Sequence, residues 1–205
     1  MHTRIRPLTL FLLLLTLSAG ALAADPLDEG ARAFRAKDYA RAAKLWQPLA
    51  EKGNAIAQYD LGMLYQHGWG VKKDLEAARN WYYKSAMQNN AEAQYNLGLM
   101  YETAQGVFRS DLEAFKWWKY AASQGQPDAE YNLGVMYAYG YGTAQDWGMA
   151  IELWVRATKH GNKQAPAAMA RAYRAGKFGL RKDPKLAAEW EAAAKRAAGM
   201  GNDSP

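Results

Sequence analysis

The chain has 205 residues, half of them hydrophobic, and is long enough for one ordinary domain with a substantial core. The absence of cysteine excludes disulfides and a lipid-modified cysteine anchor. Its 26 basic and 20 acidic side chains are unevenly placed, because residues 25–155 carry a net charge of −3 and residues 156–205 one of +7. A basic end of this moderate size does not indicate nucleic acid, and we expect no nucleic-acid partner.

The first 23 residues have the pattern of a secretion signal. Two arginines precede an apolar run at 8–17, and a small-x-small cleavage site follows at 21–23. The run is shorter than the roughly 20 residues that span a bilayer, and no second run of this kind follows it. We therefore expect a signal peptide over 1–23 that is cleaved near Ala23 and Ala24, a periplasmic or secreted mature chain, and no stable membrane insertion.

Residues 24–53 are predicted to form a leading pair of helices, at 27–36 and 39–50. Asp38 lies in the turn between them and is a candidate N-cap residue, because its side chain can accept from the free N–H groups of the second helix. Several residues of this pair recur 36 positions later in the next stretch of the chain. We interpret the pair as an incomplete unit that caps a repeat array.

Three units of 36 residues follow, at 54–89, 90–125 and 126–161, and each is predicted to contain a helix, a glycine-bearing loop and a second helix. The first helices repeat a glycine on their apolar face. Because glycine in a helix costs about 1 kcal/mol, we attribute it to close approach of the paired helix. The helix glycines are Gly62, Gly98 and Gly134; the predicted caps are Asn54, Asn90, Asp74, Ser110 and Asp146; the buried second-helix residues are Ala78, Trp81, Ala86, Ala114, Trp117, Ala122, Ala150, Leu153 and Ala157.

A fourth unit, 162–198, completes the array over 54–198. Its loop is one residue longer, because Asp183 follows Asp146 by 37 residues instead of 36. Asn162 is its predicted N-cap. A terminal unit of an array is expected to be atypical, since one of its sides faces water. The last residues, 199–205, have no apolar anchor and are predicted to form a disordered tail.

The repeated residues follow the pattern AxAxxxLGxxYxxGxGVxxDxxxAxxWxxxAAxxG, which resembles the consensus of the Sel-1-like repeat, a relative of the tetratricopeptide repeat. The resemblance covers about 54–199. The sequence departs from the pattern at Thr103-Ala104, Ser110, Leu153 and the longer fourth loop, which affects loop shape and not the fold. The resemblance implies an all-α fold, a right-handed solenoid whose first helices line a concave groove.

Members of this family are mostly adaptors without catalysis. Exported bacterial members include envelope regulators, assembly factors, host-protein binders and immunity proteins that neutralise secreted toxins. Some cysteine-rich relatives bind β-lactams, but this chain lacks those cysteines.

On such a fold, the residues beside the buried stripe of each first helix face the groove and form three ladders. Tyrosine offers a large contact area at low entropy cost, and an asparagine amide can both donate to and accept from an extended peptide. The candidate protein-binding groove consists of Tyr59, Tyr95 and Tyr131; Asp60, Asn96 and Asn132; Met63, Leu99 and Val135; the carboxylates Glu92, Glu102 and Asp128; and Arg171 and Arg174 of the basic fourth unit.

The same residues allow a second interpretation, in which the tyrosines pack between units and the asparagines bond within the solenoid. Catalytic and metal-binding patterns are weak. His67 and His160 occupy different repeat positions, so no shared metal site or catalytic triad follows from them. We expect no enzymatic activity, no metal and no cofactor.

The sequence therefore predicts a non-enzymatic, exported repeat scaffold that binds another protein or an extended peptide of the cell envelope, as an envelope regulator or assembly adaptor. One alternative is an immunity protein that neutralises a secreted toxin. An alternative of another class is an envelope hydrolase of the β-lactamase type. The identity of the partner and the oligomeric state do not follow from these residues.

Overall fold

The computed structural model describes residues 25–199, and every regular element in that range is an α-helix, which confirms the all-α repeat fold. The predicted signal peptide at 1–23 lies outside the described residues, as does most of the predicted tail. Within 25–199, none of the helices is both long and apolar enough to cross a bilayer. The helices are α1 (Pro26–Arg35), α2 (Tyr39–Glu51), α3 (Ala55–His67), α4 (Leu75–Ala86), α5 (Ala91–Glu102), α6 (Asp111–Ser123), α7 (Pro127–Tyr139), α8 (Trp147–Lys159), α9 (Ala165–Ala175) and α10 (Pro184–Gly199).

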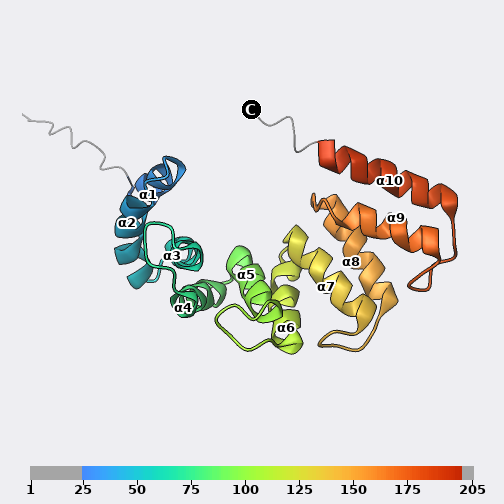
Figure 1. Cartoon of the computed structure of the whole chain (residues 1–205), viewed down its shortest axis with the longest axis horizontal. Coiled ribbons are helices and arrows are strands. Elements are labelled where there is room, and N and C mark those ends of the chain that lie inside the picture. Colours follow the sequence, from blue (N-terminus) through green and yellow to red (C-terminus); the bar gives the residue numbers. More distant parts are fainter. Residues whose placement is uncertain (1–24, 200–205) are drawn as a thin grey trace, which may run out of the picture.

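The helices form five consecutive pairs that follow one another along an open arc (Figure 1). The extensive contacts join helices that are neighbours in the chain, first within a pair and then between one pair and the next. The first helices α3 and α5 lie nearer the hollow side of the arc than their partners α4 and α6 (Figure 1). Each pair therefore depends on its immediate neighbours, as in other solenoids.

The helix ends follow the predicted capping chemistry. Side chains that precede each helix accept hydrogen bonds from its free N–H groups, and left-handed residues reverse the chain after the second helices. The capping residues, one for each helix except α9, are Asp25, Asp38, Asn54, Asp74, Asn90, Ser110, Gln126, Asp146 and Asp183. The left-handed residues are Gly53, Asn89, Gly125 and Gly161, with φ of 94°, 67°, 81° and 95°.

The first helix of the fourth unit begins later than its counterparts. The cause is Pro166, which stands where the other units have a residue whose N–H bonds to the capping residue's carbonyl. Asn162 still performs a capping role, since its Oδ1 accepts from the N–H groups of Gln164 and Ala165 at 2.9 and 2.7 Å. Its Nδ2 donates to Asp128 at 2.6 Å, which ties this turn to α7.

In the first four pairs, a glycine of the first helix packs against an aromatic ring of the second helix, whereas α9 has Ala170 at this position. A Cβ atom built on Gly98 would lie 2.3 Å from Nε1 of Trp118, so only glycine leaves room for the indole. The indole donates Nε1–H to the carbonyl of Tyr95 at 3.2 Å and is 2% exposed. The pairs of this kind are Gly30 with Trp46, Gly62 with Tyr82, Gly98 with Trp118, and Gly134 with Trp154.

This arrangement refines the predicted core of the second helices. Trp117 and Leu153 are buried as expected, whereas Trp81 is only partly buried. The rings that lie deepest between the helices of a pair are the next residues along the chain, Tyr82 and Trp118 among them. The prediction that the helix glycines allow close approach is confirmed.

We predict that Gly98→Ala lowers the free energy of unfolding by about 1–3 kcal/mol, because the methyl group must displace a buried indole. Chemical denaturation followed by circular dichroism measures the change. Gly148→Ala is the matched control: its Cβ would meet only Asp146 Oδ1, at 3.3 Å, and alanine favours the helix. A Gly98→Ala protein at least as stable as the control would contradict this account of the repeat.

Candidate functional site

The ladder residues of the first helices are half-buried at the junctions between repeats. Tyr59 and Met63 of α3 pack against the core cluster around Leu97, which belongs to the next pair. The same packing recurs one and two repeats later for Tyr95, Leu99, Tyr131 and Val135. These side chains hold neighbouring repeats together and leave only part of their surface to solvent.

Two tyrosines of the ladder reach the asparagine of the following repeat. Asn96 lies close enough to the Tyr59 phenol to oppose the rise in its pKa, and Asn132 does the same for Tyr95. Burial raises the pKa of Tyr95 to about 12, the carboxylate of Asp128 adds to this rise, and the side chain of Asn132 opposes it. These contacts between tyrosine and asparagine favour the second of the two interpretations, in which the two side chains interact within the solenoid. A partner would contact the solvent-exposed parts of these tyrosine and asparagine side chains.

Exposed carboxylates surround the same tyrosines. Glu92 raises the pKa of both Tyr59 and Tyr95, and Glu102 raises the pKa of Tyr95, so these carboxylates lie near the phenol groups. Asp60 differs from them because it is half-buried, and burial raises the pKa of its carboxyl to about 6. The predicted acidic residues therefore gather along α3, α5 and the start of α7.

Buried polar side chains connect each second helix to the next pair. Gln58 donates Nε2–H to the carbonyl of Ala50 at 3.0 Å and accepts from Gln88 Nε2 at 2.8 Å. The arrangement is neutral and its polar atoms are hydrogen-bonded, as buried polar groups require. The next junction repeats it with Gln94, Ala86 and Gln124.

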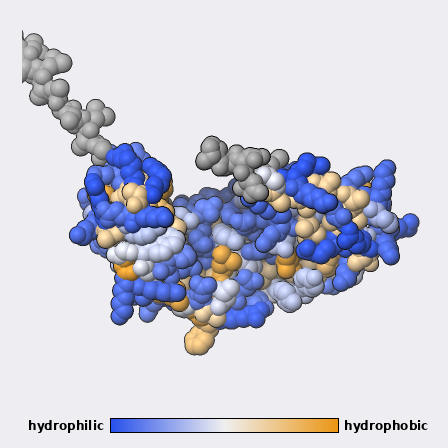
Figure 2. Space-filling view, turned by 45° about the horizontal axis from the view of Figure 1, so that its top comes forward, coloured by the Kyte–Doolittle hydropathy of each residue, from blue (hydrophilic) through white to orange (hydrophobic). Residues whose placement is uncertain are grey.

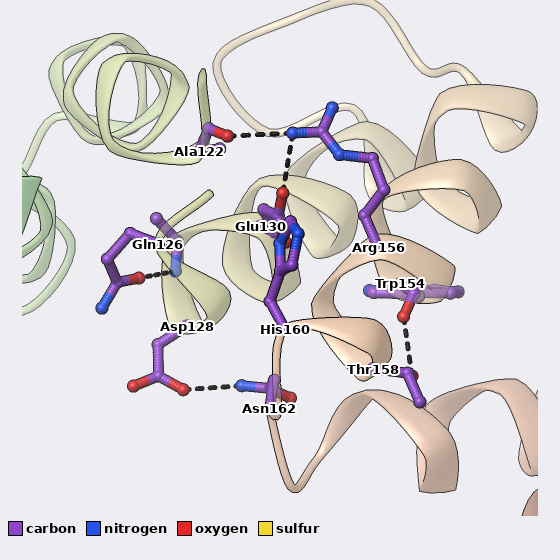
Figure 3. Close-up of polar contacts among 10 residues, drawn as sticks. Ala122, Gln126, Asp128, Glu130, Trp154, Arg156, Thr158, His160 and Asn162 are labelled. Carbon is purple, nitrogen blue, oxygen red and sulfur yellow. Dashed lines mark hydrogen bonds and ion pairs between the residues drawn. The ribbon is translucent and has the colours of Figure 1, made fainter. Parts of the chain in front are cut away.

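The third junction replaces this neutral set with charged groups (Figure 3). Glu130 takes the position of the glutamines and is fully buried. Its carboxylate accepts from Arg156 Nη2 at 2.7 Å and lies 2.8 Å from Nδ1 of His160. Arg156 also donates to the carbonyl of Ala122 at 3.0 Å, which a glutamine amide reaches at the earlier junctions. The buried carboxylate is therefore paired with the guanidinium of Arg156 and the imidazole of His160, and is not left without a partner.

The arginines of the candidate groove lie apart from the acidic group, on α9. Arg174 forms an ion pair with Glu191 of α10. Arg171 and Arg174 line a cavity of about 460 Å³ between α7 and α9, together with Tyr131 and Val135. The structure thus divides the predicted groove into an acidic part and a basic part that includes this cavity.

The predicted groove omits the aromatic side chains that complete the cavity, Tyr139, Trp154 and Phe178. The sequence holds two signals for them. Trp154 recurs 36 residues after Trp118, and Phe178 is the extra residue between the two glycines of the long fourth loop. Both residues stand out only when the repeats are aligned with one another.

The arrangement offers charged and aromatic side chains for binding. Within residues 25–199, no group of three or more His, Asp or Glu side chains could hold a metal ion. His67 stacks on Trp69, with ring centroids 4.3 Å apart, while His160 contacts Glu130 at a distant junction. Charged and aromatic groups along the inner surface can instead bind another macromolecule.

Comparison with known families decides what these pairs are. The Sel1 repeat signature matches residues 27–54, 55–90, 91–126, 127–162 and 165–201. The chain belongs to the Sel1 repeat family. The leading helical pair, interpreted from sequence as an incomplete capping unit, is matched as a Sel1 repeat as well. The protein is therefore a Sel1 repeat scaffold, a class that binds proteins and is generally without catalysis.

The chain is similar to bacterial Sel1 repeat proteins of known structure and to part of one yeast protein. A Sel1 repeat protein from Oxalobacter formigenes is 35% identical, with a TM-score of 0.81 over 87% of this chain and 70% of that one. The protective antigen c5321 of uropathogenic Escherichia coli is 26% identical, with a TM-score of 0.77 over 86% of this chain and 38% of that one. A Candida glabrata protein, the ERAD-associated E3 ubiquitin-protein ligase component HRD3, is 41% identical over 49 residues, which are 24% of this chain and 6% of that relative's length.

We predict that Asp60→Asn stabilises this Sel1 protein above about pH 6. The native state keeps the Asp60 proton to a higher pH than the unfolded chain, whose carboxyl has the ordinary pKa of 3.8, so the unfolding free energy falls as pH rises between these values. Allowing for solvent screening, the gain near pH 8 is about 1–2 kcal/mol and disappears below about pH 4. Denaturation curves across this pH range measure it. Asn96→Asp, the mirror variant, should lose stability over the same range; unchanged pH dependence in both would contradict the assignment.

We also predict that Arg156→Gln lowers the unfolding free energy by about 2 kcal/mol, because it removes a charged partner from the buried Glu130 carboxylate. Glu130→Gln should cost less, since Arg156 is 39% exposed and can be solvated. The double variant, which approaches the neutral junctions of the other repeats, should recover part of the loss. A double-mutant cycle by denaturation tests this. Additive losses would show that the two side chains do not interact.

Proposed function

We propose that this Sel1 chain is a non-catalytic adaptor that binds another protein along the inner surface of its arc. The observation that carries the proposal is the division of charge on that surface. Acidic side chains surround the tyrosine ladder of α3 and α5, and basic side chains line the cavity beside α9. A partner with the complementary charge pattern would gain specificity and faster association more than raw affinity.

Two further features support the proposal. Burial raises the pKa of the half-buried Asp60 carboxyl to about 6, and perturbed groups of this type gather at functional sites. The face drawn in Figure 2, turned so that the upper, hollow side of the arc comes forward, is mainly hydrophilic with small separate hydrophobic patches. Recognition by polar, charged and aromatic contacts is therefore favoured over burial of one large apolar patch.

We propose that the binding takes place in the cell envelope or outside the cell. The support is the signal-like pattern of residues 1–23, with its arginines, short apolar run and small-residue site. Envelope regulation or assembly is the role that we favour, and an immunity protein would use the same surface for a secreted toxin. The chemical nature of the captured partner distinguishes these roles.

We predict that reversing the charge of Glu92 and Glu102 to arginine weakens partner binding by about tenfold or more, because both carboxylates are exposed beside the tyrosine ladder. The immobilised wild-type chain first captures partners from an envelope extract, and mass spectrometry identifies them. Their affinity for the double variant is then measured by surface plasmon resonance.

The matched control reverses Glu76 and Glu152, which are equally exposed but lie on the second helices α4 and α8. It has the same net charge and should bind within about twofold of the wild type, since surface charges away from an interface contribute little. Equal losses in both variants, at unchanged helicity, would exclude the inner surface as the binding face.

A further inference from the structure

The cavity between α7 and α9 combines aromatic walls with a basic rim. Tyr131, Tyr139 and Trp154 supply part of its wall, and the loop after α9 supplies Phe178 and Lys177. Its volume of about 460 Å³ is in the range of sites that hold a large side chain or a small ligand.

The cavity exists because the last repeat, formed by α9 and α10, departs from the others at two positions. Earlier junctions place Asn96 and Asn132 against a tyrosine of the preceding repeat. At the corresponding position the last repeat has Ala168, so the side chain that would meet Tyr131 is missing and space remains. The methyl group of alanine leaves this part of the wall apolar.

The second departure is Phe178, the extra residue of the loop between α9 and α10. Its φ is 57°, in the left-handed region, which costs a residue with a side chain roughly 1–2 kcal/mol. The ring packs edge-on against Trp154, with centroids 5.4 Å apart, and against Tyr139 at 5.7 Å. A strained conformation that places a ring in a cavity wall is typical of functional sites.

The charges around the cavity all have one sign. Arg171, Arg174 and Lys177 line it, and no acidic side chain does. Arg174 is engaged by Glu191, whereas Arg171 and Lys177 form no ion pair with any described residue of 25–199. Both are exposed and can therefore meet an anionic group.

We propose that this cavity binds an acidic segment of a partner protein, with an apolar side chain inserted between Tyr131 and Phe178 and neighbouring carboxylates paired with Arg171 and Lys177. The inference rests on the proposed adaptor function and specifies which part of the partner meets which end of the groove. The acidic residues near Tyr59 and Tyr95 repel the same segment, so it binds at the α9 end in preference to the rest of the surface.

Four pools of short fluorescent peptides test the proposal by fluorescence polarisation on the full chain. Each pool has randomised flanks around a fixed centre: phenylalanine among Asp and Glu, alanine among Asp and Glu, phenylalanine among Asn and Gln, or phenylalanine among Lys and Arg. The first pool should bind about tenfold or more tightly than the others, since it alone offers both contacts. Amidated and free C-termini within that pool show whether the carboxylate of a chain end contributes.

Two variants locate the binding. Arg171→Glu with Lys177→Glu should reduce binding of the first pool to the level of the pool with Asn and Gln flanks. Lys72→Glu with Lys73→Glu, an exposed pair in the loop between α3 and α4, should leave that binding unchanged. Phe178→Gly keeps the left-handed backbone without strain and removes the ring. It should abolish the preference for phenylalanine over alanine and retain the preference for acidic peptides.

Three outcomes would overturn the proposal: no preference for the first pool, equal losses in the two charge-reversed proteins, or tighter binding to vesicles of anionic phospholipid than to any peptide pool. Each is distinguishable from failure of the adaptor function. A captured partner that is lost on reversing Glu92 and Glu102, but is insensitive to Arg171→Glu with Lys177→Glu, leaves the adaptor function standing and removes only the acidic-segment site.

Discussion

The contact between a helix glycine and the ring of its paired helix sets the geometry on which the rest of the protein depends. With no Cβ at Gly62, Gly98 or Gly134, the ring of Tyr82 or of a tryptophan lies directly on the helix backbone. Helix pairs built in this way have closely similar shapes, and stacking them produces a regular arc. Because the pairs are so similar, residues at the same position of different repeats can be compared. Where one repeat has a different residue from the others, the requirements of the repeat fold do not explain the difference.

Those departures concentrate where the inner surface could bind a partner. Asp60 stands where the next two repeats have an asparagine, and burial raises the pKa of its carboxyl. At the other end Ala168 stands in place of the asparagine, beside a cavity. Phe178 adds a strained aromatic wall to that cavity. The charged junction at Glu130 differs from these because its side chain is fully buried and bonded to Arg156, which makes it a structural variant of the neutral junctions.

Much of the fold could be predicted from sequence because it depends on local rules. The 36-residue period, capping residues such as Asp74 and the loop glycines each follow from neighbouring residues. The site was less accessible, because contacts between repeats depend on the rotation from one pair to the next. Packing within a pair decides whether Trp117 or Trp118 lies under the glycine. The rotation from one pair to the next decides whether Tyr95 reaches Asn132, 37 residues away. Trp117 and Trp118 both lie at positions where aromatic residues recur, so the sequence alone does not show which of the two is buried more deeply.

Photo-crosslinking tests most directly whether partners bind the inner surface of the arc. A photoreactive amino acid replaces Glu92 beside the tyrosine ladder in one protein, and Tyr120, which is 49% exposed on the second helix α6, in another. Both are irradiated with the captured partner. The account predicts a cross-linked product from position 92 and none from position 120. A product from position 120 alone, or equal products from both, would contradict it.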